Sequence, residues 1–113
     1  MNKFDVAYFI KKFEATTNQG WAMGKFQIKV EEFSEKGNRY YTKFCALGHC
    51  GAYFAANDTE ESRALDELIG ESPLRYGEDI FHINDGKEGW DTAGDTPRER
   101  ILHVLYHIRE AEG

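Results

Sequence analysis

The sequence has few of the features that mark secreted or membrane proteins. Its 113 residues include only two cysteines, too few to staple a disulfide-dense secreted scaffold. No stretch approaches the roughly 20 apolar residues of a membrane span. Residues 1–17 carry an acid at Asp5 within a broken apolar run, unlike a secretory signal. We therefore expect a cytoplasmic protein with no membrane association, with both cysteines reduced and buried as small apolar side chains.

Positive charge is also scarce. Lysine and arginine number 14 against 20 acidic residues, which gives a net charge of −6. Because a nucleic-acid backbone repels such a chain, nucleic-acid binding is not expected. Neither G-x-G-x-x-G nor G-x-x-x-x-G-K-[ST] occurs, so no phosphate-binding loop indicates a nucleotide cofactor.

The composition that remains is that of one folded domain. Hydrophobic residues make up 41% of the chain and aromatic residues 14%, enough for a core at this length. No internal repeat, low-complexity segment or linker divides the sequence. We expect a single domain over residues 1–113.

Four segments have the apolar character or periodicity of helices: 3–15, 46–56, 57–70 and 96 to about 111. Residues of capping type mark their ends. Asn2 is the expected N-cap of the first helix. Asp58 and Glu61 have capping-box spacing before the third helix, and Gly70 stands where a C′ glycine belongs. The Thr-Pro-x-Glu segment that begins at Thr96 is the strongest start signal in the chain.

Two segments alternate with the period of a strand, 25–33 and 39–45. The five residues 34–38 between them favour a turn, with Gly37 suited to positive φ. A third, shorter strand is a candidate at 80–84. The predicted fold class is therefore α+β: a β-hairpin, with a third strand as an option, packed against about four helices.

The predicted hairpin carries a small basic patch. Lys25, Lys29 and Lys43 could share its outer face with Tyr41. An ordinary solvated sheet face explains these side chains better than contact with nucleic acid does.

Two glycines interrupt the segment that follows the hairpin. Gly48 and Gly51 each cost a helix about 1 kcal/mol relative to alanine. We expect their small size to allow close packing against another backbone segment.

Cysteine and histidine gather in the segment C-A-L-G-H-C. Cys45 and His49 are spaced i, i+4 and could offer two zinc ligands, with His82 as a third. A complete set of four ligands with zinc spacing does not occur. His103 and His107 share one helix face but lack the glutamate of the metalloprotease motif, so a half-exposed face is the better interpretation. We expect neither a metal nor a cofactor.

One catalytic arrangement stays open, that of a thiol hydrolase. It requires a cysteine at a helix N-terminus, where the dipole lowers the thiol pKa, together with a histidine base and an orienting acid or amide. Cys45 stands at the predicted strand-to-helix junction, and His82 and Asp85 could approach it. Sequence spacing alone does not establish such a geometry.

The pair Asn84 and Asp85 follows a short apolar run. Such residues commonly bond their own backbone and fix a turn, which is the favoured interpretation. The alternative is that both point into a cleft beside residues 45–51 and bind a ligand or partner. Together with His49 and Trp90 they are the predicted binding residues.

Three segments together resemble a family of small bacterial and phage proteins of unknown function: CALGH at 45–49, INDG at 83–86 and TPRERILHVL at 96–105. Members of that family have a C-A-L/V-G segment after a strand, then a helix, an Asn-Asp pair and a Thr-capped terminal helix. The resemblance implies a compact α+β domain and no particular activity. It draws attention to Cys45, Gly48, Asn84 and Asp85.

The sequence favours a non-enzymatic binding or interaction protein. Small size, an acidic balance, a surplus of aromatic residues and the lack of a complete catalytic set all point this way. The ligand would be a protein or a small molecule, and a phage or mobile-element accessory protein that acts on a host protein is the specific role considered. The alternative is a small cysteine-dependent hydrolase that uses Cys45, His82 and Asp85.

Overall fold

The computed structural model describes residues 4–23, 25–53, 58–70, 80–85 and 96–112. These ranges contain five α-helices, a short 3-10 helix and a two-stranded antiparallel sheet, which confirms the α+β fold class. No helix in these ranges is long and apolar enough to cross a membrane. In chain order the elements are α1 (Val6–Glu14), η1 (Asn18–Gly20), β1 (Gln27–Glu32), β2 (Arg39–Phe44), α2 (Ala46–His49), α3 (Glu60–Gly70), α4 (Ile80–Asp85) and α5 (Pro97–Glu112).

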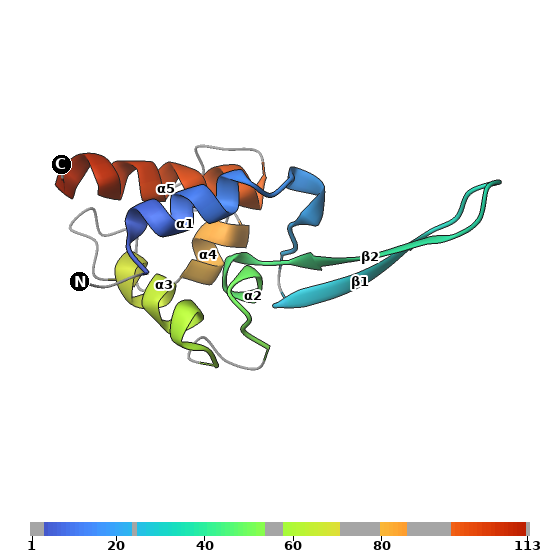
Figure 1. Cartoon of the computed structure of the whole chain (residues 1–113), viewed down its shortest axis with the longest axis horizontal. Coiled ribbons are helices and arrows are strands. Elements are labelled where there is room, and N and C mark those ends of the chain that lie inside the picture. The colour runs from blue at the N-terminus through green and yellow to red at the C-terminus, as the bar shows by residue number, and fades with distance from the viewer. Residues whose placement is uncertain (1–3, 24, 54–57, 71–79, 86–95, 113) are drawn as a thin grey trace.

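The helices surround one apolar core, and α1 lies along α5 (Figure 1). Three hydrogen bonds tie these helices together. Arg98 donates from its Nε to the carbonyl of Phe13 at 3.1 Å and from a terminal nitrogen to the carbonyl of Glu14 at 3.0 Å. The hydroxyl of Tyr106 donates to the Glu14 carboxylate at 3.0 Å. The core includes the fully buried side chains Phe9, Phe13, Leu47, Leu65, Ile69, Ile80, Ile83, Ile101, Leu105 and Ile108.

The predicted helix starts are right in one case and displaced in two. Thr96 caps α5 as predicted, because its Oγ1 accepts the N–H of Glu99 at 3.2 Å. The N-cap of α1 is Asp5, whose carboxylate accepts from Tyr8 N–H, so Asn2 is not the cap. The reciprocal box before α3 joins Thr59 to Ser62 rather than Asp58 to Glu61. The Asp58 carboxylate instead accepts from the backbone N–H of Tyr53.

The predicted strand at 80–84 is wrong, because these residues form helix α4. Ile80, Ile83 and Asn84 are all buried, and the spacing i, i+3, i+4 places them on one helix face. In a strand, Ile80 and Ile83 would point to opposite faces. The β-branched residues favoured a strand locally, and burial of one helical stripe overrode that preference.

The helix predicted over 46–56 is also shorter than expected. Among its described residues, 46–53, the helix covers Ala46–His49, and Gly51 ends it with a φ of 92°. The N–H of Ala52 bonds the carbonyl of Leu47, and the N–H of Gly51 bonds that of Gly48. This pattern is a Schellman motif, in which glycine takes up the left-handed conformation.

The hairpin projects from the helices (Figure 1). We call residues 25–44 the arm. Val30 lies opposite Tyr41 in the antiparallel register. Gly37 has a φ of 120° in the turn, as predicted. The projection gives the molecule extents of 50 × 29 × 23 Å, because the arm has helices beside it only at its base.

Replacing Thr96 with alanine is expected to lower the free energy of unfolding by about 1 kcal/mol, since the N–H of Glu99 loses its acceptor. Thr96 also donates to the Asn18 side chain at 3.2 Å, so α5 would loosen from η1 as well. Urea denaturation followed by circular dichroism measures the change. Thr96→Ser keeps the hydroxyl and should retain most of the stability. Equal loss in both variants would contradict the capping role.

Candidate functional site

The predicted site centres on Cys45, at the junction of β2 and α2. Its backbone is extended, and its Sγ accepts the N–H of Gly48 at 3.4 Å, so the thiol serves as the N-cap of α2. The residue is 3% exposed. Burial raises the pKa of the Cys45 thiol, although the hydrogen bond from Gly48 opposes the shift. The thiol is therefore protonated at neutral pH, which disfavours nucleophilic catalysis.

Gly48 lies directly against the backbone of the arm. A Cβ at this position would be 2.0 Å from the carbonyl oxygen of Phe26 and 3.3 Å from the Cβ of Phe44. The same Phe26 oxygen accepts the N–H of Cys45 at 3.2 Å. The close backbone packing predicted for this glycine is thus confirmed, and it joins α2 to the base of the arm.

Asn84 connects three segments of the core. Its Oδ1 accepts the N–H of Ala46 at 3.1 Å, and its Nδ2 donates to the carbonyl of Ala22 at 2.8 Å. Its Nδ2 also lies 3.1 Å from a carboxylate oxygen of Asp85. These bonds reach segments 38 and 62 residues earlier in the chain. Asn84 therefore lies beside residues 45–51, as one hypothesis held, but it satisfies buried backbone groups there. The favoured prediction, that Asn84 bonds its own segment of backbone and fixes a turn there, does not describe these two bonds, because Ala46 and Ala22 are distant in the sequence.

The other predicted site residues have varied placements. Asp85 ends α4 and is half-buried. His82 belongs to α4, but its side chain lies outside the described structure, and Trp90 lies outside the described residues altogether. The arrangement of Cys45, His82 and Asp85 therefore stays a prediction.

Arg100 is a buried residue that the sequence analysis missed. It is 7% exposed. Its Nε donates to the carbonyl of Ile83 at 3.1 Å, and one terminal nitrogen donates to that of Asn84 at 2.9 Å. The guanidinium thus satisfies two carbonyls at the end of α4. Arg100 precedes Val104 by four residues, so both lie on the apolar face of α5. This spacing could have predicted that Arg100 is buried.

His49 is enclosed by aromatic rings rather than exposed as a binding group. Its ring centroid lies 4.5 Å from that of Trp21, 5.3 Å from that of Phe44 and 6.3 Å from that of Phe13. Its Nε2 is buried and has no hydrogen-bond partner among the described residues. Burial lowers the pKa of His49 to about 4, with the Lys12 charge acting in the same direction and a hydrogen bond with the Gly20 backbone opposing it.

Acid should destabilise the protein through His49. The imidazole is neutral in both states above its ordinary pKa of 6.5, but between pH 6.5 and about 4 only the unfolded chain binds the proton. Stability is therefore lost as the pH falls through this window. A pKa lowered from 6.5 to about 4 corresponds to about 3 kcal/mol, and partial solvent contact reduces the expected loss to about 2 kcal/mol.

Denaturation curves between pH 7 and 4 would measure this loss, with His49→Phe as the control. Phenylalanine fits an aromatic surrounding and has no proton to bind. The variant should lose about 2 kcal/mol less than the parent over the same window. Parallel stability curves for the two proteins would contradict the assignment.

Cys50 lies in a second polar neighbourhood, between α1 and α3. Lys12 pairs with Glu61 at 2.9 Å, and Tyr8 donates to the same carboxylate oxygen at 2.6 Å. Burial raises the pKa of the Cys50 thiol to about 12, and the Glu61 charge adds to that effect while Lys12 opposes it. Both cysteines are free and buried, as predicted. Neither has the surroundings of a reactive thiol.

Metal ligands do not converge in the described parts of the chain. No group of three histidine, cysteine, aspartate or glutamate side chains there could hold an ion. His103 and His107 are half-buried, as predicted, with ring centroids 4.4 Å apart.

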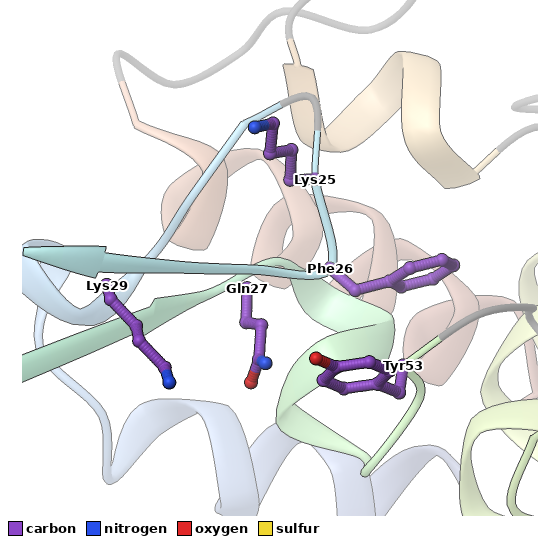
Figure 2. Close-up of a pocket in the computed structure, with 5 residues that line it drawn as sticks. All are labelled: Lys25, Phe26, Gln27, Lys29 and Tyr53. Carbon is purple, nitrogen blue, oxygen red and sulfur yellow. The ribbon is translucent and has the colours of Figure 1, made fainter.

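The most exposed aromatic side chains of the described residues lie on the arm and at its base. Phe33 is 78% exposed, Tyr40 70% and Tyr53 55%. A pocket of about 500 Å³ lies at the base of the arm and is lined by Lys25, Phe26, Gln27, Lys29 and Tyr53. Figure 2 shows these five residues. Gln27 and Lys29 extend to the side of the strand on which Tyr53 lies. The sequence pattern predicts the hairpin but does not single out these aromatic residues.

The strand register corrects the basic patch. Lys29 lies opposite Thr42, whereas Lys43 lies opposite Ile28 and Tyr41 opposite Val30. Directly opposed residues share a face and successive residues alternate. Lys29 is therefore on one face of the arm, and Lys43 with Tyr41 is on the other.

The aromatic side chains of the arm are more exposed than the predicted site residues Cys45 and Asn84, which are buried in the interior.

Comparison of the chain with family models, with curated proteins and with solved structures gives no match.

Proposed function

We propose that this protein is a non-enzymatic binding module whose arm contacts a partner protein. The observation that carries the proposal is the projection of a two-stranded hairpin with large aromatic side chains on its surface. A two-stranded hairpin is marginal in water unless further strands or helices cover it. Exposed aromatic residues are also the type that contributes most to protein interfaces.

The state of Cys45 supports binding over cysteine chemistry. A catalytic thiol needs access and a depressed pKa, whereas Cys45 is 3% exposed and its pKa is raised by burial. Its sulfur is already used to cap α2. A role as an accessory protein of a phage or mobile element, acting on a host protein, stays a prediction from the resemblance.

Affinity capture with tagged protein from cells that produce it tests the proposal. The double variant Phe33→Ser, Tyr40→Ser removes two exposed aromatic side chains of the arm. We expect it to lose at least about tenfold in captured partner. Met23→Ser is the control, because Met23 is also exposed, at 53%, but precedes the arm.

The two variants separate the outcomes. A partner lost with the arm variant and retained with the control supports the proposal. Retention by both variants would contradict it and place the contact elsewhere. Rapid alkylation of Cys45 in the folded protein at neutral pH would instead favour the hydrolase alternative.

A further inference from the structure

We infer that β1 pairs with β1 of a second copy of this chain, antiparallel, about a two-fold axis at Val30. The inference rests on the proposed function of the arm and names its partner. Each copy would extend its two-stranded sheet into a shared four-stranded one, joined edge to edge.

The hydrogen-bonding direction of β1 leaves one edge available. Phe26 and Cys45 are directly opposed by the register, and the N–H of Cys45 donates to the carbonyl of Phe26 at 3.2 Å. Antiparallel pairs alternate, so residues 28, 30 and 32 face β2, and the backbone groups of Gln27, Lys29 and Glu31 face outward. No strand in the described ranges pairs with that side of β1.

The outer edge of β2 is less suited to pairing along its length. At its base the carbonyl of Phe44 accepts the N–H of Ala22 at 2.9 Å, and Trp21 forms a bridge with the same residue. Self-pairing about Tyr41 would also set Arg39 opposite Lys43, a like-charge contact. The edge of β1 has neither obstacle among the described residues.

The charges of β1 are complementary to those of β1 in a second, antiparallel copy. With the axis at Val30, Lys29 lies opposite Glu31 of the second copy. Symmetry produces this opposite-charge pair twice. An axis at Lys29 or at Glu31 would place identical charges face to face, which destabilises a sheet.

An axis shifted to Ile28 keeps fewer of these contacts. It sets Lys29 opposite the uncharged Gln27. It also moves Phe33 beyond the start of β1 on the second copy. The axis at Val30 therefore gives the best match of charge.

The same register gives the exposed Phe33 a place to bind. It lies opposite Gln27 of the second copy, on the side of the strand to which Gln27 and Lys29 extend beside Tyr53 (Figure 2). Gln27, Lys29 and Tyr53 are among the residues that line the pocket of about 500 Å³ at the base of the arm. Phe33 is 78% exposed in the single chain, so pairing would bury an aromatic ring at each end of the shared strand pair.

Sedimentation equilibrium of the purified full chain tests the inference. The mass should rise from 13.0 kDa to twice that value as concentration increases to about 0.1 mM. Lys29→Glu and Glu31→Lys should each raise the dissociation constant at least about tenfold, because each creates two like-charge pairs. The double variant Lys29→Glu, Glu31→Lys restores opposite charges and should restore the dimer.

Two proline variants test which edge is used. Lys29→Pro removes an outward N–H of β1 and should abolish the dimer while β1 still pairs with β2. Thr42→Pro is its match, since Thr42 lies opposite Lys29 and its N–H faces outward on β2. It should leave the dimer intact, and circular dichroism verifies that both variants fold.

Three results would overturn the inference: a parent protein that stays monomeric at about 0.1 mM, a double charge variant that fails to regain the dimer, or a dimer that persists with Lys29→Pro. None of them would decide the proposed function. A monomeric protein whose arm still captures a different protein would keep that proposal and exclude the second copy as its partner.

Discussion

Gly48→Ala is expected to lower the free energy of unfolding by about 3 kcal/mol or more. The added Cβ would stand 2.0 Å from the carbonyl oxygen of Phe26. That oxygen belongs to the backbone and accepts the N–H of Cys45, so it cannot move away as a side-chain end would. Relief of the clash requires α2 to separate from the base of the arm. Urea denaturation followed by circular dichroism would measure the loss.

Gly20→Ala is the matched control for this prediction. A Cβ at Gly20 would have only the Thr17 hydroxyl near it, at 3.9 Å, an ordinary contact distance. We expect this variant to stay within about 1 kcal/mol of the parent. A Gly48→Ala protein as stable as Gly20→Ala would mean that α2 and the arm are not packed as closely as described.

Asn84→Ala is expected to cost about 2–4 kcal/mol, because it leaves two buried backbone groups without their partners. One is the N–H of Ala46 and the other is the carbonyl of Ala22. Asn84→Asp keeps an acceptor for Ala46 but loses the donor to Ala22 and places a second carboxylate beside Asp85. It should therefore also be destabilised. Chemical denaturation of both variants gives the comparison.

Asn38→Ala provides the control with the same change of side chain. Asn38 is exposed, and its amide donates to Glu31 at 3.1 Å. Removal of this surface contact should change stability by about 0.5 kcal/mol or less. An Asn84→Ala protein with parental stability but lost partner binding would instead make Asn84 a binding residue, as one of the sequence hypotheses held.

Local patterns were sufficient to predict the longer elements. The stripe of Val6, Phe9, Ile10 and Phe13 is buried on α1 as its spacing indicates. Thr96 caps α5, and the two strands pair around a turn with Gly37 at positive φ. Each of these features depends on residues within a few positions of one another, which is why propensity, capping and periodicity describe them.

The same local patterns failed where two structures competed. The segment IFHIND has β-branched residues that favour a strand, but the core accepts Ile80, Ile83 and Asn84 as one helical stripe. Cys45 was correctly placed at the junction with α2, yet the sequence could not show that its sulfur caps that helix. Burial depends on which segments pack over a residue, and that information is non-local.

The α+β class, the hairpin, the apolar faces of α1 and α5, and the close approach at Gly48 could be predicted, because they follow from side-chain size and spacing along the chain. Three other features became visible with the folded chain: the bonds from Asn84 to Ala46 and Ala22, the aromatic rings around His49, and the projection of the arm with its aromatic side chains exposed. The difference comes from distance along the chain. The partners of Asn84 lie 38 and 62 residues away, and their positions are set by packing of the whole core rather than by local preference.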